Sequence, residues 1–176
     1  FLCCAGLGIM PEASEYRENL RKNKDITYLP KLTAFILDRM NTEHLNAVEI
    51  EVSGQFKKMK TASLVISNNR FSRSDSWGAE HFKKESLQDG ELGIYVLKIN
   101  SFWDKLRLIF KLGFGGWKTD PVITEWASQS LKIRTKKAHE LISLDGEPFE
   151  IPTPLLFSVK PKSLQLLVPL QQEALA

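Results

Sequence analysis

The feature that most constrains the fold of this chain is the period of its apolar residues. Residues 47–52 read Ala-Val-Glu-Ile-Glu-Val, so apolar and acidic side chains alternate. A period of two puts one set of side chains on the core face of a strand and the other set on the solvent face. From Pro121 onward, short segments of strand character recur between turn residues. Many short strands spaced in this way predict a β-sandwich or a partly closed barrel.

The strand pattern covers most of the chain. The polar residues 11–25 predict a short solvated helix or a loop, and residues 68–84 read as irregular. Strands are expected at residues 47–52, 61–66, 92–99, 122–126, 130–135, 140–144, 155–159 and 164–168. The first two are expected to form a hairpin, with the chain turning at Ser53 and Gly54. The predicted fold class is mainly β with two or three helices, a β-sandwich-like domain.

Two segments have helical spacing instead. Apolar residues recur at helical intervals in residues 30–40 and in residues 101–112, which predicts two amphipathic helices against the sheets. Ser101 can cap the second helix with Asp104 as its capping-box partner. Gly113 is expected to end that helix.

The first nine residues form an apolar run. The run lacks an initiating Met and a preceding positive region, which a signal peptide requires. It is also about half as long as the ~20 apolar residues of a membrane span. We therefore expect a buried strand whose chain continues upstream, in a single domain over residues 1–176 that is a fragment of a longer chain.

Composition and charge narrow the function classes. With 43% hydrophobic and 26% charged residues, the chain is typical of a soluble globular domain. Its net charge of +3 is too small to indicate a nucleic-acid partner, although it allows a modest affinity for an anionic membrane. The adjacent Cys3 and Cys4 form no plausible disulfide framework, which indicates a reducing, cytoplasmic location.

Two Asp-Gly-Glu tripeptides are the sharpest candidates for chemistry, at residues 89–91 and 145–147. On composition alone, each is well explained as a turn. In the alternative interpretation, Asp145 and Glu147 are carboxylates at a strand end that accept a proton during phosphoryl transfer to a hydroxyl. Asp89 could similarly hold a hard cation together with main-chain oxygens and water.

Three segments together resemble the second domain of the soluble diacylglycerol kinase family, whose relatives include sphingosine and ceramide kinases. Residues 4–13 resemble the Gly-rich opening strand of that domain, and residues 87–92 its Asp-Gly-x-Leu strand. The closing block is the most specific part. It combines Leu-Asp-Gly-Glu at residues 144–147 with a Val-x-Pro-x-x-Leu-x-Leu pattern over residues 159–166.

The resemblance implies a role for particular residues. Glu147 and Asp145 would be the proton-accepting carboxylates, with Glu147 as the base. Asp89 would hold a structural Mg²⁺ ion, with the main-chain oxygens of Ser86 and Glu91 as further ligands. The sequence departs from the family at Gln88, where an acidic residue is frequent, and in residues 68–78, which contain a single glycine.

The resemblance also implies partners. ATP would be bound mainly by an upstream domain that this chain lacks, so the fragment alone is expected to be inactive. The substrate would be a lipid at a membrane surface, diacylglycerol before a sphingoid lipid, and the protein would be cytoplasmic and peripherally membrane-associated. The sequence leaves homo-oligomerisation open. The rival interpretation is a non-catalytic β-sandwich that binds lipid or protein.

Aromatic residues gather around the second predicted helix, at Trp103, Phe110, Phe114 and Trp117. Core packing is the expected role, because these side chains bury large areas. The alternative is exposure, in which case they would guide the protein to a membrane interface. Lys132, Arg134 and Lys136 alternate on one strand face and are expected to be solvated, or else to contact anionic headgroups or phosphate.

Overall fold

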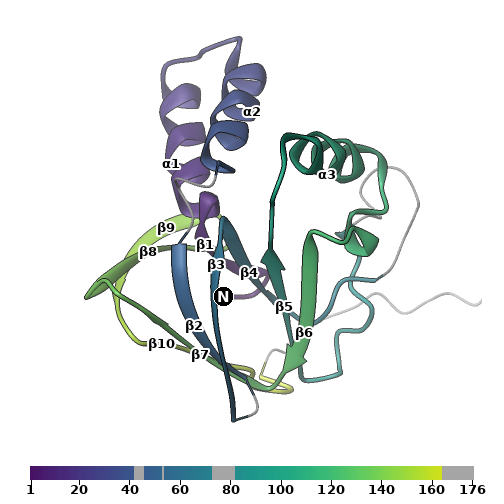
Figure 1. Ribbon diagram of the computed structural model, residues 1–176. Coiled ribbons are helices and arrows are strands. Elements are labelled where there is room, and N and C mark those ends of the chain that lie inside the picture. The colour runs from purple at the N-terminus through teal and green to yellow at the C-terminus, as the bar shows by residue number, and fades with distance from the viewer. Residues whose placement is uncertain (42–45, 53, 73–81, 164–176) are drawn as a thin grey trace, which may run out of the picture.

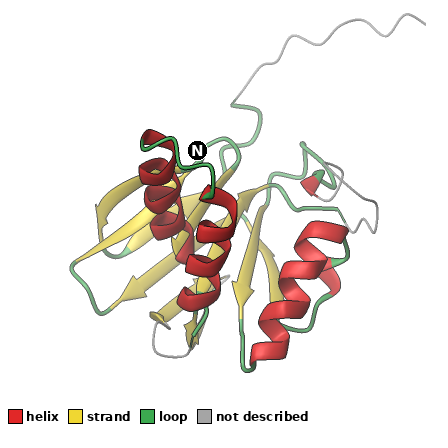
Figure 2. Cartoon of the chain, turned by 90° about the horizontal axis from the view of Figure 1, so that it is seen from above, coloured by secondary structure: helices red, strands yellow, loops and turns green. Residues whose placement is uncertain are grey.

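The computed structural model describes residues 1–41, 46–52, 54–72 and 82–163, and these residues form two packed antiparallel sheets (Figures 1 and 2). Sheet A has six strands in the order β6-β5-β4-β1-β8-β9, and sheet B has four in the order β10-β7-β2-β3. The strands are β1 (Cys4–Gly8), β2 (Asn46–Val52), β3 (Gln55–Thr61), β4 (Ser63–Asn68), β5 (Leu92–Leu97), β6 (Ile123–Ser128), β7 (Ser130–Thr135), β8 (His139–Leu144), β9 (Glu147–Pro152) and β10 (Leu155–Ser158).

The main core lies between the two sheets. Seven of the ten strands contribute buried side chains, such as Ala5 and Leu7 of β1 and Val48 and Ile50 of β2, all less than 5% exposed, whereas β3, β6 and β9 contribute only partly buried ones. This alternation follows from the period of two in the sequence. The predicted fold class, a mainly β sandwich-like domain, is confirmed.

Two strands were not predicted, and one predicted hairpin is wrong. The partner of β2 is β3, whereas residues 63–68 form β4 in the other sheet. The sequence of β3 does not alternate between apolar and polar residues, because five of its seven residues are exposed. Similarly, β9 carries no fully buried residue. The predicted strand over residues 164–168 lies outside the described residues.

Helices α1 (Ile9–Lys22) and α2 (Tyr28–Arg39) form an antiparallel pair beside sheet A (Figure 1). α1 packs on β1, β8 and β9, and a Cβ atom at Gly6 would lie only 2.7 Å from Met10 Cβ. The segment predicted as a short helix or loop is therefore a full helix. α2 buries none of its residues, although the ring of Phe35 stacks on Tyr16 with centroids 4.5 Å apart.

Helix α3 (Phe102–Phe114) begins with the predicted capping box of Ser101 and Asp104. It does not stop at Gly113, because the helix continues to Phe114 and Gly115 occupies the C-cap at φ 106°. A short 3₁₀ helix, η3 (Trp117–Thr119), follows it. Within the described residues, no helix is both long and apolar enough to cross a bilayer.

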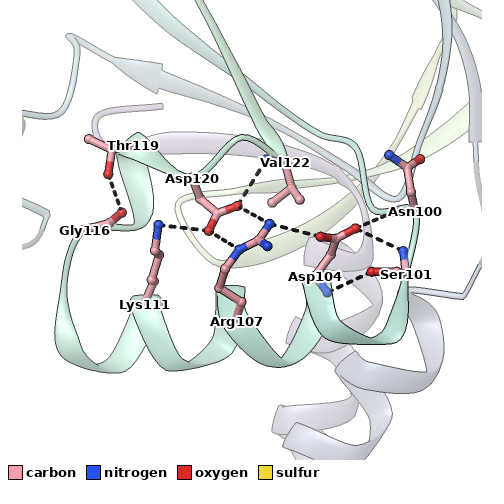
Figure 3. A network of polar contacts seen from close by, with 9 residues as sticks. All are labelled: Asn100, Ser101, Asp104, Arg107, Lys111, Gly116, Thr119, Asp120 and Val122. Atoms are coloured by element: carbon pink, nitrogen blue, oxygen red, sulfur yellow. Dashed lines mark hydrogen bonds and ion pairs between the residues drawn. The ribbon is translucent and has the colours of Figure 1, made fainter.

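Polar side chains fasten α3 to the segment that follows it (Figure 3). The fully buried carboxylate of Asp120 accepts hydrogen bonds from Arg107 Nε at 2.9 Å and from the Val122 amide at 3.1 Å. Lys111 Nζ lies 3.1 Å from the same carboxylate. The inner side of α3 is therefore held by charges as well as by buried Leu108.

The expected core role of the aromatic cluster is wrong for three of its four members. Trp117 is buried at 6% exposure, but Trp103, Phe110 and Phe114 are 72%, 62% and 42% exposed. The reason is that α3 turns its charged side toward Asp120, which leaves its apolar side facing outward.

Asp120 should give the protein an acid-sensitive stability. Burial acts to raise its pKa, but the hydrogen bonds from Arg107, Val122 and Lys111 outweigh burial and lower the pKa to about 2, from 3.8 for a free aspartate. A lowered folded-state pKa stabilises the protein above the unfolded value and loses that contribution as the pH falls toward 2. We expect about 2 kcal/mol to disappear between pH 4 and pH 2. Urea unfolding across this range should show a shallower pH slope for Asp120→Asn, and an unchanged slope would contradict the assignment.

Candidate functional site

The two Asp-Gly-Glu motifs lie at the same end of sheet A. Asp145 follows the last residue of β8, and Glu91 precedes the first residue of β5. In the strand register, Leu144 lies opposite Ala5, Cys4 opposite Ser67, and Asn68 opposite Leu92. β4 and β1 separate β5 from β8, which makes three interstrand spacings or about 14 Å. The motifs therefore share one sheet end but are too far apart to bind one metal ion together.

Asp145 is the most constrained of the predicted residues. Its carboxylate accepts hydrogen bonds from the main-chain amides of Leu2 at 2.7 Å, Cys3 at 2.8 Å and Cys4 at 2.9 Å. Partial burial acts to raise the pKa of Asp145, but the three amides outweigh it and hold the pKa below its usual value. A carboxylate bound in this way is a weak base. Its evident role in the structure is to tie the start of β1 to the β8–β9 turn.

The Asp145–Gly146 turn itself is a tight hairpin. Asp145 and Gly146 have φ of 51° and 95°, values that favour Asp and Gly at these positions. The turn interpretation and the carboxylate interpretation of the second motif are thus compatible.

Substituting Asp145 should therefore affect stability. Asp145→Asn keeps one acceptor oxygen but replaces the other with an amide donor, which leaves at least one of the three main-chain amides without its partner. We expect a loss of about 1–2 kcal/mol in the free energy of unfolding. Urea denaturation measures it, with Glu147→Gln as the matched control. Equal stability of Asp145→Asn and the parent protein would show that the three hydrogen bonds contribute nothing.

Glu147 differs from Asp145 in its surroundings. It begins β9, is exposed, and pairs with no other side chain of the described residues. The guanidinium of Arg17, on α1, lies beside the same turn, with Nη2 3.9 Å from the position of a Cβ atom on Gly146. Arg17 Nε is buried and has no hydrogen-bond partner among the described residues. Arg17 Nη2 also lies 3.8 Å from Glu18 Oε1. An exposed carboxylate and a guanidinium whose Nε has no hydrogen-bond partner among the described residues therefore both occur at this turn.

The predicted metal ligands lie on one exposed turn. Among the described residues, no side chain pairs with the Asp89 carboxylate, and its neighbour Gly90 has φ 65° and lies against Pro161. The Glu91 carbonyl already accepts the Asn69 amide at 3.0 Å, and the Ser86 hydroxyl accepts the Gln88 amide at 3.0 Å. No cluster of three His, Cys, Asp or Glu side chains suited to a metal occurs in the part of the chain that the structure describes. One carboxylate with main-chain oxygens fits a Mg²⁺ ion that keeps most of its waters.

Lys84 was missed by the sequence analysis, which assigned residues 68–84 to an irregular segment. Its ammonium group contacts the Ser67 hydroxyl at the end of β4 and lies 3.7 Å from the centre of the Phe71 ring. Desolvation lowers the pKa of Lys84. Because β4 lies between β5 and β1, Lys84 places a half-buried positive charge between the two Asp-Gly-Glu turns. No spacing signal marks Lys84 or Arg17, since only the tertiary fold brings them to this end of the sheet.

Comparisons with known proteins agree on the fold. No family model matches the sequence. Two solved structures of provisionally assigned diacylglycerol kinases from Bacillus anthracis str. Sterne are similar to this chain. One has 20% identity over 92% of this chain with a TM-score of 0.56, and the other 21% identity over 90% with a TM-score of 0.54. The chain spans about half the length of these proteins, 50% and 48%. The two-sheet fold described above is therefore one that also occurs within these larger proteins.

Proposed function

We propose that this chain is the lipid-side domain of an ATP- and Mg²⁺-dependent lipid kinase that phosphorylates a lipid hydroxyl, with diacylglycerol as the first candidate substrate. The observation that carries the proposal is the β8–β9 turn, where Glu147 is exposed, Arg17 Nη2 lies 3.9 Å from the position of a Cβ atom on the preceding Gly146, and Asp145 holds the turn in place. The provisional assignment of the two similar structures as diacylglycerol kinases supports the choice of reaction.

The chemistry follows from the charges at the turn. Glu147 accepts the proton of the lipid hydroxyl as its oxygen forms a bond to the γ-phosphorus of ATP and the bond to the departing ADP oxygen breaks. Arg17 offsets negative charge on the transferred phosphoryl group, as a planar guanidinium does well. Asp145 is a positioning residue. ATP itself is held mainly by residues beyond this chain, so the chain alone is inactive.

A Mg²⁺ ion would be held by Asp89 with main-chain oxygens of Ser86 and Glu91, and it would supply positive charge and order at this turn. We expect Asp89→Ala in the complete protein to raise the Mg²⁺ concentration needed for half-maximal activity and to reduce the stabilisation that Mg²⁺ gives. Mg²⁺ titration of activity and of thermal unfolding measures both effects. Glu150→Ala, on exposed β9, is the control, and a Mg²⁺ dependence equal to that of the parent protein would remove Asp89 from the metal site.

The test of the proposal is phosphoryl transfer by the complete protein from labelled ATP to diacylglycerol, with sphingosine and ceramide as competing substrates. Labelled phosphatidic acid supports the assignment, and labelled sphingoid product would retain the kinase but change the lipid. The alternative function, a non-catalytic lipid- or protein-binding module, predicts no ATP consumption with any lipid. It also predicts that the double variant Asp145→Asn, Glu147→Gln binds lipid as the parent protein does.

A further inference from the structure

Helix α3 presents an apolar face to solvent. This α3 outer face consists of Phe102, Trp103, Leu106, Phe110 and Phe114, which are 63%, 72%, 46%, 62% and 42% exposed. Four of the five residues are spaced four apart and therefore form one stripe along the helix. The Phe110 and Phe114 rings stack with centroids 4.2 Å apart. Exposed apolar patches on one element are typical of surfaces that bind a partner or a membrane.

The helix is fixed in this orientation from its inner side. Arg107 and Lys111 bind buried Asp120, and Lys105 Nζ contacts Asn41 Oδ1 at the end of α2 (Figure 3 shows the Asp120 contacts). Rotating α3 to bury its apolar stripe would leave the Asp120 carboxylate buried without its cations, which is strongly unfavourable. The exposure is therefore built into the fold and is not an effect of a loosely attached helix.

The position and charge of α3 limit what can cover it. Figure 2 shows α3 at the edge of the described part of the molecule. Residues 98–120 contain five cations and two carboxylates. The side chains of Lys105 and Lys118 are buried, so the cations that reach solvent beside the face are Lys98, Arg107 and Lys111. The side chains of Arg107 and Lys111 remain 42% and 30% exposed although they bind Asp120. Both carboxylates are engaged: Asp104 is 18% exposed in the capping box, and Asp120 is fully buried. A second copy of the same face would bring two positive rims together, whereas an anionic surface would complement them.

We propose that the α3 outer face docks on the surface of an anionic lipid bilayer, with its aromatic side chains in the interfacial layer and the exposed parts of Lys98, Arg107 and Lys111 against lipid headgroups. Trp and Phe on one side of a helix with Lys and Arg beside them are the composition of interfacial membrane-binding helices. The inference extends the proposed function, because a kinase that acts on a membrane lipid needs a surface that meets the bilayer. Its test requires no turnover, so failure of either proposal is distinguishable from failure of the other.

The experiment is co-sedimentation of the complete protein with vesicles of phosphatidylcholine, with and without phosphatidylglycerol. We expect Trp103→Ala with Phe110→Ala to weaken binding to the anionic vesicles about ten- to a hundredfold, since two large apolar groups no longer enter the interface. The matched control is Phe56→Ala with Leu156→Ala, which removes two side chains that are 58% and 73% exposed on sheet B. Thermal unfolding checks that both double variants are folded.

A second measurement reports on the helix itself. Trp103 fluorescence should shift to shorter wavelength and be quenched by brominated lipid, and Trp103→Phe should remove this response while retaining most of the binding. Equal binding by the α3 variant and the sheet B control would overturn the proposal, as would no binding of the parent protein to either vesicle. Two further results would also overturn it: a shift from dimer to monomer in the α3 variant, or a Trp103 that is shielded from a soluble quencher in the complete protein. These would assign the face to a second copy or to another part of the complete protein.

Discussion

Replacing Glu147 with Gln in the complete protein is expected to lower kcat for lipid phosphorylation by about 10²- to 10⁴-fold, the contribution typical of a general base. The side chain is exposed and has no partner among the described residues, so the folded state loses no contact. Gln has nearly the same shape as Glu but cannot accept the proton at neutral pH. Initial rates at saturating lipid and ATP measure the effect, and urea unfolding should show an unchanged free energy.

The matched control is Glu150→Gln. Glu150 lies three residues further along the same strand and is also exposed. Its substitution makes the same change in charge on β9 and should leave kcat within about twofold, since surface changes away from special features have small effects. Near-normal turnover in Glu147→Gln, or an equal loss in both variants, would remove Glu147 from the mechanism.

Replacing Gly8 with Ala is expected to destabilise the protein by more than about 3 kcal/mol, a large fraction of the 5–15 kcal/mol of a typical domain. Gly8 joins β1 to α1 with φ 77° and ψ −120°, a combination that residues with a Cβ atom rarely adopt. A Cβ atom there would lie 2.3 Å from the carbonyl oxygen of Ala62. That oxygen accepts the Ile9 amide at 3.1 Å, so the carbonyl cannot move away without losing the hydrogen bond.

Gly54→Ala separates the two causes of this loss. Gly54, before β3, has nearly the same φ of 75°, but among the described residues beyond its chain neighbours no heavy atom lies within 4 Å of its added Cβ atom. Gly54→Ala should therefore lower the free energy of unfolding only by the cost of the left-handed backbone conformation, about 1–2 kcal/mol. Urea denaturation of both variants gives the comparison. Equal losses would show that φ alone accounts for the glycine at position 8.

The strands that face a core were predictable from the sequence, and those without a buried side were not. The alternation in residues 47–52 and 130–135 identified β2 and β7 with their bounds almost unchanged. β3 and β9 were missed because their residues are mostly exposed. An alternation of apolar and polar residues arises only where one side of a strand is buried, so a strand exposed on both sides does not show it. The assignment of β3 and β4 to different sheets depends on the chain turning at Ala62, which no local pattern marks.

The candidate site was predictable as residue types in a fixed order, but not as an arrangement. From the sequence, Asp145 and Glu147 were predicted together as proton-accepting carboxylates. The structure separates their surroundings, because three amides from the start of the chain bind Asp145 and no described side chain binds Glu147. Contacts across 141 to 143 residues of chain cannot be read from local spacing.

Helix α3 was predicted from the sequence as an element, but its orientation on the sheets was not. By itself, the sequence determined that residues 101–112 form a helix with one apolar face and a capped start, because capping and periodicity are local properties. Only the tertiary structure decided which face points inward. Asp120 is buried beneath the helix and needs Arg107 and Lys111 as partners, since an unpaired buried carboxylate is far more costly than exposed aromatic rings. The position of that one carboxylate leaves the apolar face of α3 toward solvent.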